Sequence, residues 1–176
     1  IVGIVHNQTA PLKGTGIIDG HFTHHGTLMP GSNVAPGTLE FQLTYTASDL
    51  AVTELDLFGA LPGQFDTVVF PATAGSKIVN GTLRLRARTG YIPATGDSFV
   101  VMTSGGGLIG SFDLVEVVGT PRNVHAVVTV TPTNVTVTFD HVCRGIDFNN
   151  DTLFPDTQDI SDFLTVFAGG ACSTGD

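Results

Sequence analysis

Short apolar segments, separated by glycine and proline, recur along the first 140 residues of the chain. Within them apolar and polar positions tend to alternate and β-branched residues are frequent, which is typical of strands. The pattern predicts roughly ten strands, at residues 1–5, 16–24, 38–46, 51–58, 67–70, 81–88, 98–103, 111–118, 124–131 and 134–140. We therefore expect an all-β domain, either a β-sandwich of the Ig-like or jelly-roll kind or a short β-solenoid.

One predicted strand carries three positive charges on a single face. Leucine or alanine alternates with arginine there, so one face is apolar and the other presents Arg84, Arg86 and Arg88. Such a stripe is either a solvated face or meets an acidic neighbour, and the acidic C-terminal segment is one candidate. Glu54 and Asp56 share a face of an earlier strand, but two acids on one strand are common and the chain has no Trp to form a sugar platform.

Composition excludes several classes of protein. Charged residues make up 13% and hydrophobic residues 41% of the 176 residues, with 22 Gly and 9 Pro, so the chain is neither disordered nor a coiled coil. A formal net charge of -9 opposes binding to nucleic acid or to an anionic membrane. No apolar run reaches the roughly 20 residues of a membrane-spanning helix, and the start at Ile1 without an initiator Met suggests a mature or trimmed protein.

The sequence offers little catalytic chemistry. It contains no nucleophile elbow, metalloprotease helix, phosphate-binding loop or dinucleotide fingerprint, so we expect no catalytic residues and no enzyme. The best metal candidate in the body is the group His21, His24 and His25, because His21 and His25 would share one strand face. Exposed strand histidines that bind no metal are the commoner case.

The chain divides into three parts in this interpretation: a strand arm and linker at residues 1–14, a β domain at 15–140 and an acidic segment at 141–176. The arm is strongly β-prone through Ile1, Val2, Ile4 and Val5. A terminal strand on a linker can lie on its own sheet or add to the open edge of a neighbouring subunit, as donor strands do in pili. We expect the neighbour.

The acidic segment has the opening spacing of an EF-hand-type calcium loop, with oxygen-bearing side chains at Asp147, Asn149 and Asp151. Thr152 stands where an EF-hand has Gly, and the closing acid comes one residue late, so the loop is not an ordinary EF-hand. We predict bound Ca²⁺, with the ligands Asp147, Asn149, Asp151, the Leu153 carbonyl, Asp156 and Asp159. The alternative is an acidic surface turn that binds no metal.

Two further features frame this loop. The residues Ile160, Phe163, Leu164 and Phe167 lie on one face of a short helix, which Gly169 and Gly170 would end. Cys143 and Cys172 bracket the segment, and we expect them to form a disulfide, because so short a segment buries little core; two unrelated buried thiols are the alternative.

Several short sequence motifs resemble those of a known class of proteins. They are Gly-Thr-Leu at residues 26–28, 37–39 and 81–83, Pro-Gly-Gln-Phe-Asp at 62–66, Gly-Asp-Ser-Phe at 96–99, the acidic motifs at 147–151, 154–156 and 159–164, and a final Gly-Gly-Ala-Cys at 169–172. In this order they resemble the C-terminal domain of repetitive extracellular surface proteins of the planctomycete kind. The resemblance implies β-solenoid or autotransporter-like repeats and a single dockerin-like calcium loop. True dockerins carry two loops, so cohesin binding is not implied.

These observations predict a non-catalytic extracellular or cell-surface structural subunit. We expect copies of it to form a pilus-like fibre by β-strand addition of the arm, stabilised by calcium. The alternative is an accessory adhesion or carbohydrate-binding module of a larger secreted protein, with glycans as partners. Asn-x-Thr sequons make Asn7, Asn80 and Asn134 candidate glycosylation sites.

Overall fold

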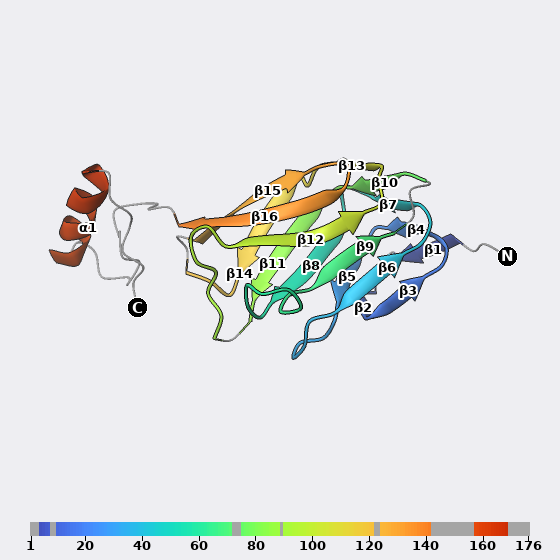
Figure 1. The fold of residues 1–176 in the computed structure, drawn as a ribbon, viewed down its shortest axis with the longest axis horizontal. Coiled ribbons are helices and arrows are strands. Elements are labelled where there is room, and N and C mark those ends of the chain that lie inside the picture. Colours follow the sequence, from blue (N-terminus) through green and yellow to red (C-terminus); the bar gives the residue numbers. More distant parts are fainter. Residues whose placement is uncertain are drawn as a thin grey trace.

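The fold is taken from a computed structural model, which describes residues 4–7, 10–71, 75–88, 90–121, 124–141 and 157–168. Strands that follow one another along the chain belong in turn to three different sheets, here called A, B and C, so the chain winds as a coil (Figure 1). The all-β prediction is confirmed. The arrangement is a coil of three largely parallel sheets rather than two sheets packed face to face.

Each sheet takes one strand from every turn of the coil. Sheet A contains β1 (Ile4–Asn7), β4 (His21–His24), β7 (Tyr45–Ala47), β10 (Lys77–Val79) and β13 (Leu108–Gly110). Sheet B contains β2 (Leu12–Gly14), β5 (Thr27–Pro30), β8 (Val52–Leu57), β11 (Thr82–Ala87) and β14 (Leu114–Val118). Sheet C begins with β3 (Gly16–Ile18), β6 (Thr38–Phe41), β9 (Thr67–Phe70) and β12 (Ser98–Ser104). All of these neighbouring strands pair in parallel.

An antiparallel hairpin completes sheet C at the C-terminal end of the coil. Strand β16 (Asn134–His141) pairs antiparallel with β12, and β15 (Val124–Val130) pairs antiparallel with β16. Val124 is buried, and Ala126, Val128 and Val130 pack against the core from the same face of β15. The hairpin therefore covers apolar surface at this end. The last element is helix α1 (Thr157–Phe167), which agrees with the predicted helix.

The opposite end of the coil consists of β1, β2 and β3, the outermost strands of their sheets. Strand β1 pairs with β4 of the same chain, from Ile4 opposite His21 to Asn7 opposite His24, and β2 pairs with β5. Residues 4–7 and 12–14 thus form part of the first turn, where their backbone groups bond to the nearest strand edge. The separate arm expected from the sequence lies here on its own sheet. Ile1 and Val2 are outside the described residues.

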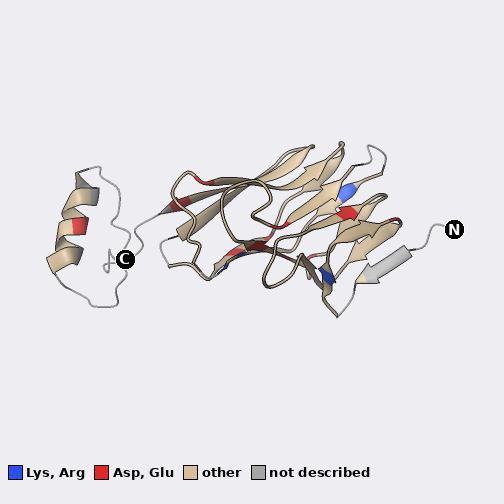
Figure 2. Cartoon of the chain, turned by 60° about the horizontal axis from the view of Figure 1, so that its bottom comes forward, with Lys and Arg blue, Asp and Glu red and all other residues tan. Residues whose placement is uncertain are grey.

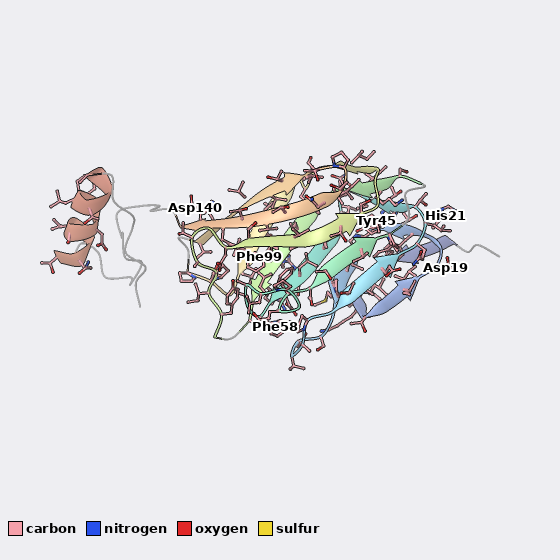
Figure 3. The ribbon with its side chains drawn as sticks, in the orientation of Figure 1. Asp19, His21, Tyr45, Phe58, Phe99 and Asp140 are labelled. Carbon is pink, nitrogen blue, oxygen red and sulfur yellow. The ribbon has the colours of Figure 1, made fainter. Side chains whose placement is uncertain are left out.

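The interior of the coil is filled by stacked side chains from successive turns. One aromatic cluster combines Phe22, Phe41, Tyr45 and Phe70, with ring centroids 4.7–5.9 Å apart. A second joins Phe65, Tyr91 and Phe139 to Phe99, at 5.1–6.5 Å. Tyr45 and Phe99 mark the two clusters in Figure 3. Aromatic pairs at these separations contribute about 0.5–1.5 kcal/mol each beyond the area they bury.

The interior also holds polar groups. His24 and Tyr45 are fully buried, and the His24 Nδ1 lies 2.7 Å from the Tyr45 hydroxyl. Burial lowers the pKa of His24 to about 4 and raises the pKa of Tyr45 well above its usual range, so both groups are neutral at neutral pH. Lys77 is buried in register with Tyr45, its Nζ donates to the Gly75 carbonyl at 2.8 Å, and burial lowers its pKa. Among the described residues no helix has the length and apolarity to cross a membrane.

Candidate functional site

The connections from sheet B to sheet C are long in three successive turns of the coil. They span residues 31–37 after β5, 58–66 after β8 and 88–97 after β11. Because they join the same two sheets, they occur at the same corner, which we call the loop corner. The Pro-Gly-Gln-Phe-Asp motif falls in it, and so do Gly96 and Asp97 of the Gly-Asp-Ser-Phe motif, whose last two residues begin β12. The loop corner is the candidate functional site.

Asp66 ties the first two loops of the corner together. Its side chain is buried, with Oδ1 accepting the Gly37 N–H at 2.8 Å and Oδ2 accepting the Asp56 N–H at 2.9 Å. The Gly31 and Gly37 backbones meet beside it: a Cβ on Gly31, whose φ is 71°, would lie 2.6 Å from Asp66 Oδ1. Only glycine fits this close approach. Asp66, the acid of the Pro-Gly-Gln-Phe-Asp motif, therefore has a structural role and holds the two loops together.

Burial also changes the acidity of Asp66. It raises the pKa of this carboxyl to about 7, and the neighbouring Asp56 adds to the rise, while the Asp56 and Gly37 N–H groups and Arg88 oppose it. A buried carboxylate without a paired cation is costly to ionise, whatever backbone donors it has. Since almost none of Asp66 is exposed, we assign it to the architecture of the corner and not to acid–base chemistry on a substrate.

Asp97 plays the matching part in the third loop. Its Oδ2 accepts the Tyr91 hydroxyl and the Ala94 N–H, both at 2.9 Å. The loop is joined to the hairpin through the Gly96 N–H, which donates to the Phe139 carbonyl at 2.9 Å. Tyr91 in turn packs against Phe99. Asp66 and Asp97, the acids of the two sequence motifs, thus both hold loops in place by accepting backbone hydrogen bonds.

The arginine stripe of β11 does meet an acidic neighbour. In-register pairing places Arg84 between Glu54 of β8 and Glu116 of β14, with N···O distances of 3.3 and 2.7 Å. Arg86 reaches the other oxygen of Glu54 at 2.9 Å. The partners thus come from adjacent turns of sheet B, and the described residues show no ion pair between the stripe and the acidic C-terminal segment. Figure 2 marks the charged residues along the described part of the ribbon.

The ion pairs of Arg84 and Arg86 with Glu54 and Glu116 are here called the charge ladder. Arg88 connects this ladder to the loop corner. It pairs with Asp56, donates to the Asn33 side chain at 3.3 Å and lies 5.9 Å from the centre of the Phe58 ring. Glu54 and Asp56, the two acids on one strand face, are therefore engaged by arginines. Carboxylates neutralised in this way are poorly suited to general acid–base catalysis.

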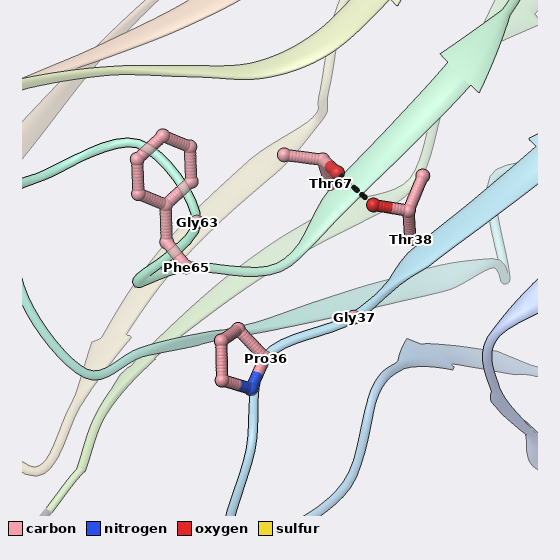
Figure 4. A pocket seen from close by; sticks show the side chains of 6 residues that line it. All are labelled: Pro36, Gly37, Thr38, Gly63, Phe65 and Thr67. Atoms are coloured by element: carbon pink, nitrogen blue, oxygen red, sulfur yellow. Dashed lines mark hydrogen bonds between the residues drawn. The ribbon is translucent and has the colours of Figure 1, made fainter.

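A small open pocket lies between the first two loops of the corner (Figure 4). Its volume is about 200 Å³. The Thr38 and Thr67 hydroxyls are hydrogen-bonded to each other at 2.7 Å on one side of it. The lining residues are Pro36, Gly37, Thr38, Gly63, Phe65 and Thr67. The sequence reasoning missed this site, because its parts lie on separate turns; the repeated Pro-Gly phrases were the available signal.

The histidine group of the sequence analysis does not form a metal site. His24 points into the coil toward Tyr45, whereas His21 is exposed at the N-terminal end and its Nδ1 bonds with the Thr44 hydroxyl (Figure 3). Strand β4 ends at His24, before His25. Among the described residues, no group of three or more His, Cys, Asp or Glu side chains could hold a metal ion.

Most of the predicted calcium loop lies outside the described residues, namely Asp147, Asn149, Asp151, Leu153 and Asp156, together with Cys143 and Cys172. Asp159 lies in the first turn of α1. Asn7 is a poor glycosylation site, because it is buried and its Nδ2 donates to the Thr27 carbonyl at 2.9 Å. Asn80 and Asn134 are half-buried and stay candidates.

No family model matches the chain, and no curated protein matches it significantly. The interpretation of the loop corner therefore rests on its own geometry.

The first prediction concerns the charge ladder. Replacing Glu54 with Gln leaves Arg84 and Arg86 without the buried carboxylate that they share. We expect a loss of about 2–3 kcal/mol in unfolding free energy, below the range for fully buried pairs because the guanidinium groups reach solvent. The half-exposed Glu116 is the control, and its change to Gln should cost less than about 1 kcal/mol. Equal losses of unfolding free energy for the two variants in urea would contradict the central role of Glu54 in the charge ladder.

The second prediction concerns Asp66. Replacing it with Asn puts an amide NH2 group where one carboxylate oxygen accepts a backbone N–H. Two donors then face each other, which should lower the unfolding free energy by about 1–3 kcal/mol. Because the folded-state pKa of about 7 lies above the unfolded value, the native protein binds more protons between about pH 4 and pH 7, and the stability contributed by Asp66 falls as pH rises. The stability advantage of the wild type over Asp66→Asn should therefore narrow from pH 5 to pH 8.

Urea unfolding at several pH values measures this difference. The exposed Asp49, changed to Asn, is the matched control and should show no such trend. An advantage that stays constant or widens toward pH 8 would refute the raised pKa.

Proposed function

We propose that the chain is a non-catalytic extracellular structural subunit, the protomer of a pilus-like surface fibre that assembles by β-strand addition at its N-terminal end. The observation that carries the proposal is the difference between the two ends of the coil. At one end the outermost strands are β1, β2 and β3; at the other, sheet C closes with an antiparallel hairpin. Outermost strands present backbone groups that can pair with another chain.

The position of β1 changes how strand addition would work. Since residues 4–7 already pair with β4, a neighbour would add to the outer edge of the first turn, or β1 would exchange between subunits. Either route joins copies through the N-terminal turn. The non-catalytic part of the proposal is supported by the acids in and beside the loop corner: Glu54 and Asp56 of β8 are paired with arginines, and Asp66 and Asp97 accept backbone N–H groups.

Calcium is the second part of the proposal. The ligands would be Asp147, Asn149, Asp151, the Leu153 carbonyl, Asp156 and Asp159, which suit a hard cation that prefers oxygen. Support comes from α1, which begins at Thr157 and so supplies the helix that follows such a loop. A disulfide between Cys143 and Cys172 would hold the segment closed in an oxidising, extracellular setting.

Assembly is tested with a charge placed on the N-terminal turn. Ile17 of β3 is 65% exposed on an outermost strand, and a lysine there should hinder strand pairing without disturbing the core. We expect wild-type protein to form fibres in electron micrographs and Ile17→Lys to stay monomeric by light scattering. Leu50→Lys, at a 75% exposed loop position, is the matched control and should assemble. Wild-type protein that is monomeric at high concentration would refute the fibre.

Calcium binding is tested by titration calorimetry and thermal melting. The wild type should bind Ca²⁺ and melt at a lower temperature with a chelator, because an ion that binds only the folded state stabilises it. Asp147→Ala and Asp151→Ala should abolish both effects, and Asp19→Ala, at an exposed position in the first turns, should retain them. Identical melting curves with and without chelator would end the calcium proposal.

A further inference from the structure

We infer that the pocket of the loop corner binds the ring of a neutral sugar. This inference goes beyond the fibre proposal and does not depend on it. The pocket combines an apolar wall, formed by the Pro36 and Phe65 rings, with a polar wall, formed by the Thr38 and Thr67 hydroxyls (Figure 4). A sugar ring has the same division, because its faces carry C–H groups and its edge carries hydroxyls.

The charge and size of the pocket narrow the ligand class. Among the residues that the structure describes, no charged side chain lines it, which disfavours phosphate, sulfate or carboxylate ligands. Its volume of about 200 Å³ is below the roughly 300–1,000 Å³ of pockets that take drug-sized molecules, and it suits a single ring. An extended peptide would need a longer groove or a strand edge.

The hydroxyl pair supplies the hydrogen bonds. Each threonine hydroxyl has one donor and two acceptor sites, and the bond between Thr38 and Thr67 uses one donor and one acceptor. One donor and three acceptor sites therefore stay available to a ligand that both donates and accepts, as sugar hydroxyls do. The sequence analysis counted the lack of Trp against a sugar platform, but the half-buried Phe65 ring can provide an apolar face here.

The walls are held before any ligand arrives. The Thr67 N–H donates to the Gly37 carbonyl at 2.9 Å, and Asp66 accepts the Gly37 N–H, so backbone bonds link the two loops at the pocket. Phe65 is fixed by an edge contact with Phe99, at 5.1 Å and 86°. A site that is already ordered loses less entropy on binding, which compensates in part for a small contact area.

Binding is tested by titrating isotopically labelled protein with the methyl glycosides of glucose, galactose, mannose and N-acetylglucosamine. We expect dissociation constants on the order of 1 mM for at least one of them, with amide shifts confined to residues 37–38 and 63–67. Thr38→Val removes one hydroxyl at constant shape and should weaken binding by tenfold or more. Thr138→Val, at an exposed position on the same sheet, is the matched control and should leave binding unchanged.

Gly63 allows a second test that leaves every contact of the pocket in place. Its φ is 82° and no atom of the described residues lies within 4 Å of a Cβ built on it, so a side chain would occupy open space at the pocket. Asparagine tolerates this backbone conformation better than most residues, so Gly63→Asn should fold and block the sugar. Absence of shifts with all four glycosides, or binding unaffected by both Thr38→Val and Gly63→Asn, would overturn the inference. Fibre assembly is scored separately, so either proposal can fail alone.

Discussion

In-register parallel pairing is the constraint on which the rest of this structure depends. When a strand lies directly above its equivalent in the previous turn, each side chain meets a counterpart at the same position of the coil. Inside, this makes columns such as Phe22, Tyr45, Lys77 and Leu108. Outside, it brings ionised groups together whether or not they are compatible. Stacked ionised groups are favourable only when neighbours differ in sign. In sheet B they do, because the charge alternates along Glu54, Arg84 and Glu116.

The loop corner is a consequence of the same regularity. Residues beyond those needed to form the strands collect in the connections between sheets B and C, at the same corner in three successive turns. Two aspartates stabilise the loops through hydrogen bonds. Asp66 links the first loop to the second, and Asp97 closes the third. Between loops fastened in this way a pocket keeps its shape without a ligand. The raised pKa of Asp66 makes this fastening dependent on pH.

Local sequence patterns predicted much of the fold. Alternation along residues 81–88 indicated the strand, its apolar face and its basic face, and the spacing of Ile160, Phe163, Leu164 and Phe167 indicated α1. The same reasoning ran β3 and β4 together at residues 16–24, because apolar residues stand on both sides of the short bend at Asp19 and Gly20. It also described residues 1–14 as an arm, because a strand's partner is not written in its own residues.

The sequence by itself determined the all-β class, the inward and outward faces of the central strands and the short helix, because side-chain alternation and helical spacing are properties of neighbouring residues. Only the tertiary structure decided that the strands form three parallel sheets, that Arg84 meets Glu54 and Glu116, and that Thr38 meets Thr67. These contacts join residues about one turn of the coil apart. Their pairing is set by how many residues each connection takes up, which alternation along a strand does not encode.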